Sequence, residues 1–423
     1  MIDLRELNTR FDEIAENIRS RNMDLDLDEV LRLQQERSSL IQETEQLRQQ
    51  RNDHAKQMKQ KLSADERQHL IEAGKGIKGR IASAEEELKK VETRYFSLAG
   101  RIPNYAHPDA PIGNEEKDNL ELRRWGTPRV FDFTPKDHME LALELDLIDF
   151  DAAVKVTGTK FYYFKREAVL MDLALQRYAL DILAAKGFIL MMTPDMAKES
   201  VAAGIGFQPR GSESNIYTVE DSDLCLVGTA EITLGAYHAQ EMMDPEVLPR
   251  KYAGISHCFR KEAGAAGQYS KGLYRVHQFS KVEMLVLTLP EHSESMHQEL
   301  VGIEEEIFQG LEIPYRVVDT CTGDLGAPAY RKYDIEAWMP GRGDLGDWGE
   351  ITSASNCTDY QARNLKIRYK RNQDIEHVHI LNGTAVAVSR ALISILENHQ
   401  RSDGSIRIPD ALVPYTGFSE IRR

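Results

Sequence analysis

The chain has 423 residues, of which 41% are hydrophobic and 29% charged, enough for two domains or for one large domain with an appendage. No apolar run approaches the roughly 20 residues of a membrane-spanning helix, and the first residues carry no secretory signal, so we expect a cytoplasmic protein without membrane segments. The formal net charge of −15 argues against nucleic acid as a partner unless one segment carries a local basic patch.

Residues 28–98 contain no proline, and their apolar residues recur in steps of three and four, which predicts the seam of a coiled coil. In the second half of this segment the seam comprises Leu70, Ile77, Ile81, Ala84, Leu88, Val91, Tyr95 and Leu98. The first half has a weaker seam, because polar residues interrupt its apolar series at Arg37, Thr44 and Arg51.

A turn signal separates the two halves. Ser63, followed by Asp65 and Glu66, has the pattern of a helix N-cap with acidic residues in the first turn. The segment therefore predicts two antiparallel helices of about 33 residues, each on the order of 50 Å long.

The far half of this hairpin is basic. Residues 48–80 hold nine Lys or Arg and four Asp or Glu, a local balance of +5 inside an acidic chain. Two interpretations stay open at this point: an ordinary solvated hairpin, or an arm that contacts a phosphate backbone.

Three prolines, Pro103, Pro108 and Pro111, end the helical segment and predict a linker. We therefore expect two domains, residues 1–110 and residues 111–423. The second has mixed helical and strand patterns, including an amphipathic helix over 170–186 that leads to an apolar segment ending at Pro194.

Common signatures of nucleotide and metal sites are missing. The chain has no GxxxxGK[ST] loop and no GxGxxG after a strand. Its cysteines are far apart, form no CxxC pair and favour neither disulfides nor a structural zinc site: Cys225, Cys258, Cys321 and Cys357.

Residues 252–262 and 273–283 have the pattern of two strands of a hairpin. Because side chains alternate between faces, one sheet face would gather a set of charged and aromatic residues, namely Arg260, Glu262, Arg275, His277, Phe279, Lys281 and Glu283. Such a face is either decorated with exposed salt bridges or satisfied by a triphosphate and a purine ring.

Residues 382–393 predict a buried helix opened by Gly383, with Arg390 in its middle. A buried arginine needs an anion, and the pattern leaves open a structural carboxylate or a phosphate. Glu350 and Ser353 offer hard oxygen ligands for Mg²⁺, although their joint use on one strand would need a bulge.

These segments carry a resemblance. Residues 259–262 with 272–283 resemble motif 2 of class II aminoacyl-tRNA synthetases, 170–194 resembles motif 1, and 382–398 resembles motif 3. Together with the arm they resemble the bacterial-type seryl-tRNA synthetase family over essentially the whole chain. The resemblance implies an α+β fold: an antiparallel β-sheet catalytic domain flanked by helices, preceded by a long antiparallel coiled-coil arm.

The resemblance also implies roles in binding ATP. Arg260 would bridge the serine carboxylate and the α-phosphate, Glu262 and Phe279 would hold the adenine, and Arg275 and Arg390 would bind the γ-phosphate. Glu350 and Ser353 would hold Mg²⁺. The same segments place further residues beside the nucleotide: Lys261, Val276, Ile351 and Thr352.

For serine, the resemblance implies that Thr229 and Glu231, separated by Ala230, lie at the amino group, and that Glu283 and Thr384 bind the hydroxyl. The partners it implies are L-serine, ATP, serine tRNA bound by the basic arm, and a second copy of the chain docked through motif 1. Selenocysteine tRNA is a further candidate substrate. Two other hypotheses are a paralogue that activates an amino acid without charging tRNA, and a non-catalytic RNA-binding scaffold.

Overall fold

The computed structural model describes residues 1–61, 63–207, 214–262 and 270–423. The chain divides into two compact units, Met1–Pro103 and Asn104–Arg423. Within the described ranges, no helix is long and apolar enough to cross a membrane.

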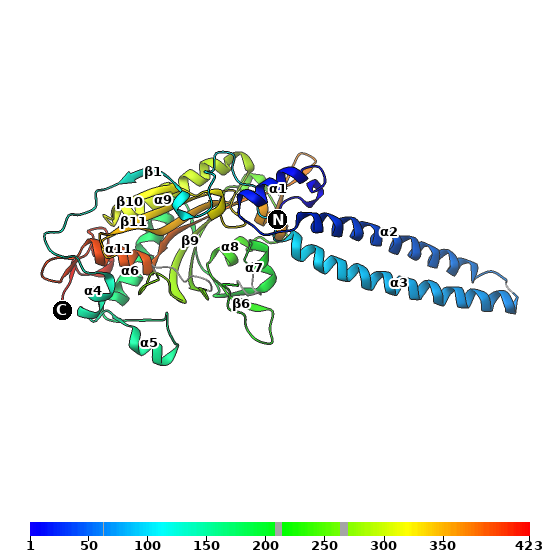
Figure 1. Ribbon diagram of the computed structural model, residues 1–423, viewed down its shortest axis with the longest axis horizontal. Coiled ribbons are helices and arrows are strands. Elements are labelled where there is room, and N and C mark those ends of the chain that lie inside the picture. Colours follow the sequence, from blue (N-terminus) through cyan, green and yellow to red (C-terminus); the bar gives the residue numbers. More distant parts are fainter. Residues whose placement is uncertain (62, 208–213, 263–269) are drawn as a thin grey trace. The chain divides into compact units, whose positions relative to one another are not determined.

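The first unit contains α1 (Phe11–Ser20) and the predicted helical hairpin, formed by α2 (Leu27–Gln57) and α3 (Ala64–Ala99) side by side (Figure 1). The Ser63 side chain accepts a hydrogen bond from the backbone N–H of Glu66, and the Glu66 carboxylate accepts one from the backbone N–H of Ser63 at 2.8 Å. This reciprocal capping box fixes the start of α3 and confirms the predicted turn.

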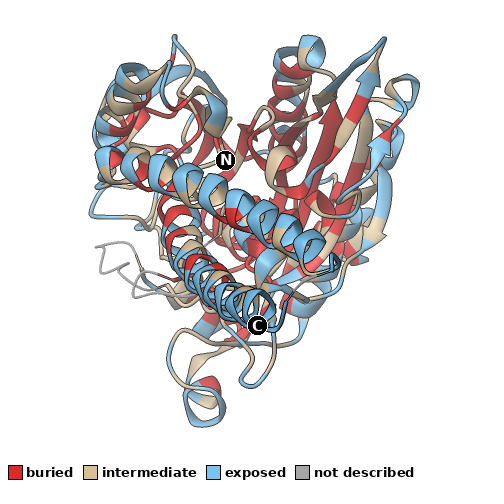
Figure 2. Ribbon diagram, turned by 90° about the vertical axis from the view of Figure 1, so that its right-hand side faces the viewer, coloured by how far each residue is buried: buried red, intermediate tan, exposed pale blue. Residues whose placement is uncertain are grey.

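The hairpin is held by a narrow seam. Most of both helices is exposed, and buried residues recur only at intervals along them (Figure 2). Val30, Leu33 and Leu47 of α2 are buried in this seam, as are five of the predicted positions of α3: Ile81, Ala84, Val91, Tyr95 and Leu98. Thr44 is buried in the same seam because its hydroxyl donates to the Leu40 carbonyl at 2.7 Å. Arg37, which also interrupts the seam, pairs instead with Glu92 on α3 at 3.0 Å.

The proline-rich segment predicted as a linker is packed onto the second unit from Asn104 onward. The Asn104 backbone N–H donates to the Ala327 carbonyl at 2.8 Å, and its side-chain amide donates to the carbonyl of Cys357 at 2.9 Å. The structural boundary between the units therefore lies at Pro103, before the other two prolines.

The second unit is organised by an eight-stranded sheet in the order β1-β10-β11-β12-β15-β9-β8-β4, antiparallel except for the parallel pair β4–β8. The strands are β1 (Leu120–Trp125), β10 (Tyr315–Asp319), β11 (Arg331–Met339), β12 (Asp347–Asn356), β15 (His379–Ala387), β9 (Gln278–Thr288), β8 (Arg250–Phe259) and β4 (Ile189–Met192). This antiparallel sheet with helices confirms the fold class that the resemblance implied.

One face of the sheet packs against three helices, α6 (Glu167–Ala185), α9 (Ser293–Gly310) and α11 (Val388–Asn398), which surround the main apolar core (Figure 1). The central strand β9 shows how the faces are divided. Its even-numbered residues Val282, Met284 and Val286 lie in this core. Its odd-numbered residues Phe279, Lys281 and Glu283 line a pocket on the other face, as a period of two requires.

Further along the pocket face, Leu285 and Leu287 of β9 join a second apolar core with short elements that flank the pocket. The shorter helices of this unit are α4 (His138–Glu144), α5 (Phe150–Val156), α7 (Glu199–Ile205), α8 (Glu231–Gly235), α10 (Tyr360–Leu365) and α12 (Val413–Thr416). The shorter strands are β2 (Ile148–Asp149), β3 (Tyr163–Phe164), β5 (Met196–Lys198), β6 (Leu224–Leu226), β7 (Met242–Met243), β13 (Arg368–Arg371), β14 (Asp374–His377), β16 (Ile406–Arg407) and β17 (Glu420–Ile421).

Two neighbouring central strands carry a β-bulge. In β12, Thr352 pairs with Ile335 and Glu350 with Glu336, so that Ile351 is an extra residue. In β15, Thr384 pairs with Glu283 and Val386 with Val282, so that Ala385 is extra. Bulges redirect side chains and are frequent beside binding sites.

The predicted helix over 382–393 is correct only in its second half. Residues up to Ala387 continue strand β15, and the helix α11 begins at Val388. A fully buried apolar run does not reveal its own period, because a central strand and a buried helix are both apolar on every side.

Candidate active site

A pocket lies on the sheet face opposite α6, α9 and α11, over strands β9, β12 and β15. Its lining includes every residue to which the resemblance assigned a role except Ala230 and Lys261, and it does not include His277, which was predicted on the same sheet face. Residues in this lining that had no assigned role include Phe207, Tyr274, Lys281, Ser355, Asn382 and Ser389. Ala230 is buried beneath Gly254 of β8, and the Lys261 ammonium lies 5.9 Å from the Tyr217 ring centroid.

The prediction that Arg260, Glu262 and Arg275 share a strand face is wrong, because these residues lie outside the strands. β8 ends at Phe259 and β9 begins at Gln278. Glu262 has a φ of +50°, a left-handed conformation that cannot continue a strand. Tertiary contacts, not strand alternation, bring the three side chains into the pocket.

Two arginines on these connecting segments have partners within the site. The Arg260 Nε donates to the Gly228 carbonyl at 3.2 Å, and its guanidinium lies 5.3 Å from the Phe279 ring centroid. Arg275 pairs with Glu262 at 3.3 Å. The arginines and the ring thus form one wall that can present cations and an aromatic face to a ligand.

The third arginine, Arg390, reaches the pocket from the first turn of α11. Its Nη1 pairs with Glu350 Oε1 at 3.1 Å, and its guanidinium lies 4.8 Å from the Tyr274 ring centroid. Of the two anions that the sequence left open for Arg390, the structure shows the carboxylate of Glu350. Burial acts to raise the pKa of Glu350, but Arg390 and the nearby Lys332 and Arg260 outweigh it, so this pKa lies below its ordinary value.

The sequence indicated that Glu350 and Ser353 could act together only if a bulge lay between them. The bulge at Ile351 is in this position. Glu350 pairs with Glu336 and Ser353 with Asp334, and these two partners are two residues apart on β11. Directly opposed residues share a sheet face, so Glu350 and Ser353 lie on the same side. The two β11 carboxylates are themselves paired with cations, Asp334 with Lys332 at 3.1 Å and Glu336 with Arg316 at 2.6 Å.

Glu231 is a buried carboxylate at the start of α8. One of its oxygens accepts hydrogen bonds from the amide of Gln361 at 2.7 Å and from the amide of Asn382 at 3.0 Å. Burial, reinforced by the negative charge of Glu283, raises its pKa to about 7. Its backbone N–H bonds the Thr229 hydroxyl at 3.2 Å, which ties these two predicted residues together.

Opposite Glu231, the carboxylate of Glu283 forms an ion pair with Lys281. The Thr384 hydroxyl donates to Glu283 at 3.3 Å and accepts from Lys281 at 3.4 Å. All three side chains are buried. The arrangement leaves oxygen acceptors directed into a small polar end of the pocket, suited to a ligand with an amino group and a hydroxyl group.

Strand alternation placed Lys281 on the same face as Phe279 and Glu283, but the sequence assigned it no role. Two further residues that complete the site were not found from the sequence. Gln361 and Asn382 reach Glu231 from 130 and 151 residues away, and no local pattern signals such contacts.

Comparison with known proteins gives the same picture for both units. Residues 1–106 match the model of the seryl-tRNA synthetase N-terminal domain, and residues 217–399 match the tRNA synthetase class II core domain (G, H, P, S and T). The chain is 57% identical over 422 residues to a serine–tRNA ligase of Treponema denticola, with 100% of each chain covered.

Two solved structures are also similar. The seryl-tRNA synthetase from Pyrococcus horikoshii complexed with ATP has a TM-score of 0.87 and 41% identity, covering 100% of this chain and 99% of the other. The cytoplasmic serine–tRNA ligase from Naegleria fowleri in complex with AMP has a TM-score of 0.80 and 33% identity, covering 97% and 95%.

The raised pKa of Glu231 predicts a pH-dependent effect of its removal. Between an ordinary value of 4.5 and about 7, the folded protein holds a proton that the unfolded chain has released. This contribution to stability is complete at low pH and is lost as the pH rises through about 7. We therefore compare the free energy of unfolding of Glu231→Gln with that of the wild type at each pH. The difference in favour of the variant should be larger at about pH 8 than at about pH 5, by up to roughly 3 kcal/mol.

Urea unfolding of both proteins at the two pH values, without ligands, checks this expectation. Asp410→Asn, at an exposed residue, is the control for the loss of one carboxylate. A stability difference that is independent of pH, or that changes in the opposite direction, would contradict it.

Proposed function

The chain belongs to the seryl-tRNA synthetase family of class II aminoacyl-tRNA synthetases, and from this premise we propose how its pocket residues divide the work of the reaction. The enzyme activates serine with ATP and transfers the seryl group to tRNA. The observation that carries the residue roles is one pocket in which the polar end around Glu231, Glu283 and Thr384 adjoins three arginines.

In the first step, a carboxylate oxygen of serine attacks the α-phosphorus of ATP, and pyrophosphate leaves. The serine carboxylate is already ionised, so the step needs no general base, and catalysis rests on positioning and on stabilisation of the developing charge. Arg260, held by the Gly228 carbonyl, bridges the serine carboxylate and the α-phosphate.

ATP lies along the wall formed by the connecting segments. Phe279 stacks on the adenine, Glu262 accepts hydrogen bonds from it, and Arg275 and Arg390 bind the γ-phosphate. Lys261, Val276, Ile351 and Thr352 flank the nucleotide. The ion pairs of Arg275 with Glu262 and of Arg390 with Glu350 support these roles, because they keep both guanidinium groups paired until phosphate oxygens become available.

Glu350 and Ser353 are the proposed ligands of Mg²⁺. Their oxygens are the hard donors that this ion prefers, the bulge at Ile351 puts both on one sheet face, and the lowered pKa keeps Glu350 ionised. When bound, the ion supplies charge neutralisation for the phosphates.

Serine is recognised at the polar end. Thr229 and Glu231 receive its amino group, while Glu283 and Thr384 bind its hydroxyl. An ammonium group beside Glu231 favours the charged carboxylate and offsets the burial that raises its pKa. Alanine leaves Glu283 and Thr384 without a ligand partner in a buried site, whereas threonine is rejected only through its extra methyl group.

In the second step, a terminal ribose hydroxyl of tRNA attacks the seryl-adenylate. We assign binding of the tRNA to the hairpin of the first unit, which has exposed cations near its tip at Lys59, Lys61, Arg67, Lys75, Lys78 and Arg80. Cations on an extended arm bind an RNA backbone by charge and shape rather than by sequence. A paralogue that does not charge tRNA would have no use for the arm, and a non-catalytic scaffold would have no use for the catalytic pocket.

A second copy of the chain is the proposed partner of the surface formed by α6, β4 and β5. This surface exposes large apolar side chains: Val169, Leu170, Leu173, Ile189, Leu190, Met192 and Met196. β4 is also the edge strand of the main sheet. An apolar surface beside a free strand edge favours association with another chain.

We place the enzyme in the cytoplasm, where tRNA is charged. Its four cysteines are buried and free, which suits a reducing compartment. Charging of selenocysteine tRNA stays a prediction.

The residue roles predict selective losses in serine-dependent ATP–pyrophosphate exchange. Arg260→Ala should lower the exchange rate by about a hundredfold or more, since charge stabilisation is lost in the transition state.

Glu283→Ala should lower the preference for serine over alanine by about a hundredfold. Exchange assays with serine, alanine and threonine measure both effects. Equal exchange with alanine and serine in the wild type would overturn the substrate assignment, and an unchanged preference in Glu283→Ala would overturn the role of that residue.

The tRNA-binding role predicts a charge-dependent effect at the arm tip. The double variant Lys75→Glu/Lys78→Glu should weaken binding of serine tRNA about tenfold or more and reduce its salt dependence, while exchange stays unchanged. The matched variant Lys75→Arg/Lys78→Arg retains the charge and should bind normally. Equal tRNA affinity in the two double variants, measured by filter binding at several salt concentrations, would exclude this role.

The dimer proposal predicts that Leu173→Glu, which puts a charge on the apolar surface, produces monomers. Leu122→Glu on β1, at the opposite edge of the sheet, is the control and should leave the oligomeric state unchanged. Light scattering coupled to size exclusion reports the mass. A monomeric wild type, or a dimer that persists in Leu173→Glu, would contradict the proposal.

A further inference from the structure

We propose that His138 and Glu397 are positioning residues that lock the segment carrying Tyr274 and Arg275 to helix α11. Neither residue lines the site described above. They form a buried pair next to it, with 8% and 2% of their side-chain surfaces exposed. The inference rests on the proposed role of the pocket in binding ATP.

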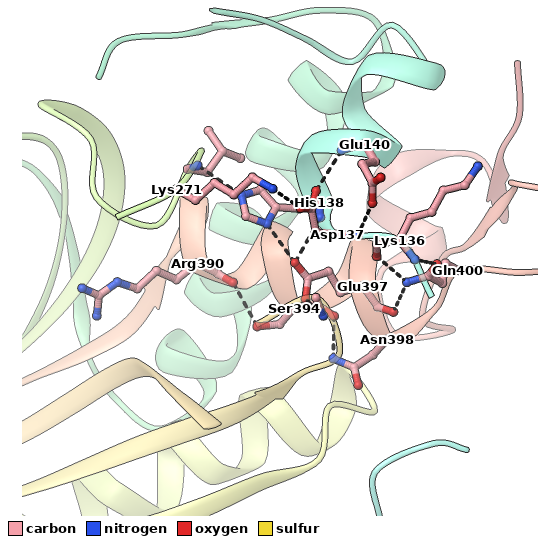
Figure 3. A network of polar contacts seen from close by, with 12 residues as sticks. Lys136, Asp137, His138, Glu140, Lys271, Arg390, Ser394, Glu397, Asn398 and Gln400 are labelled. Atoms are coloured by element: carbon pink, nitrogen blue, oxygen red, sulfur yellow. Dashed lines mark hydrogen bonds and ion pairs between the residues drawn. The ribbon is translucent and has the colours of Figure 1, made fainter. Parts of the chain in front are cut away.

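Glu397, near the end of α11, accepts three hydrogen bonds. Its Oε1 accepts from the backbone N–H of His138 at 3.0 Å and from the His138 ring Nδ1 at 2.8 Å. Its Oε2 accepts from the backbone N–H of Gly341 at 2.8 Å. Figure 3 shows the carboxylate directed at the imidazole ring, which comes from the start of α4. Burying this carboxylate is tolerable because three N–H donors satisfy it.

The other ring nitrogen of His138 holds the connecting segment. Its Nε2 lies 3.4 Å from the backbone nitrogen of Leu273, whose N–H can only donate. The Nε2 is therefore the acceptor, and the ring proton is on Nδ1, where it is donated to Glu397. Glu397 thus selects the tautomer that can bind the Leu273 N–H.

The backbone of this segment approaches the ring closely. Gly272 has a φ of +59°, and a Cβ atom at this position would lie 2.3 Å from His138 Nε2. Only glycine leaves room for both the turn and the imidazole. The contact thus depends on both residues: on the imidazole of His138 and on the absence of a side chain at Gly272.

The consequence for the pocket follows from chain connectivity. Tyr274 is next to the anchored Leu273, and the guanidinium groups of Arg342 and Arg390 each lie 4.8 Å from its ring centroid. Arg275 comes immediately after it. α11 carries Arg390 and, two turns later on the same face, Glu397. Helix α11 therefore fixes the position of Arg390 directly. Through Glu397 and His138 it also fixes the position of the segment that carries Arg275.

Two substitutions at His138 separate the two hydrogen bonds of its ring. In His138→Asn the side-chain amide can replace Nδ1 and donate to Glu397, but no acceptor remains for Leu273. In His138→Gln the carbonyl oxygen can reach the position of Nε2 and accept from Leu273. We expect the KM for ATP in serine-dependent exchange to rise about tenfold in His138→Asn and to stay near the wild-type value in His138→Gln. The KM for serine should change little in either.

A purely structural role of His138 would give a different result. It would lower the thermal stability of both variants without an effect selective for ATP, and that outcome overturns the proposal. Equal increases in the KM for ATP in both variants overturn it as well. Should His138→Asn fail to fold, Glu397→Gln decides, because its amide offers one acceptor oxygen in place of two: a rise in the KM for ATP alone supports the proposal, and an unselective effect refutes it. Absence of serine-dependent exchange in the wild type would instead refute the proposed function.

Discussion

The site depends on the pairing of charges inside a pocket that also has to exist without ligands. Unpaired buried charges are costly, so each must have a partner in the ligand-free protein. Lys281 with Glu283, Arg275 with Glu262 and Arg390 with Glu350 satisfy this requirement. Glu231 is hydrogen bonded to two amides, and burial together with the charge of Glu283 raises its pKa to about 7. Ligand binding then exchanges partners rather than creating charge interactions anew.

The sheet supplies the positions for this pairing. Alternation along β9 assigns one set of side chains to the apolar core and the other to the pocket, so a single strand links stability to binding. The bulges at Ile351 in β12 and at Ala385 in β15 shift this alternation in two further strands of the sheet. Without the first bulge, Glu350 and Ser353 would lie on opposite faces, and the proposed metal site could not form.

The helices connect the site to the rest of the second unit. α11 places Arg390 at one end and Glu397 two turns later, and the contact of Glu397 with His138 fixes the backbone from which Arg275 extends. The first unit is built differently, since its hairpin buries only a few residues of each helix and so exposes most of its surface. That surface is available for a large partner, whereas the pocket encloses a small one.

The amino-acid sequence alone was enough to predict the hairpin, the apolar faces of α6 and the strands, and the chemical types of the residues in the pocket. Heptad spacing, strand alternation and capping arise from residues a few positions apart, so they can be read from the chain alone. It took the folded structure to show that Arg260 and Glu262 leave the strand, that residues 382–387 form a strand, and where the bulges fall. The folded structure also shows contacts such as that of Gln361 with Glu231 and of His138 with Glu397, which join residues 130 and 259 positions apart. Such contacts depend on how separate elements pack against one another, and no local periodicity encodes them.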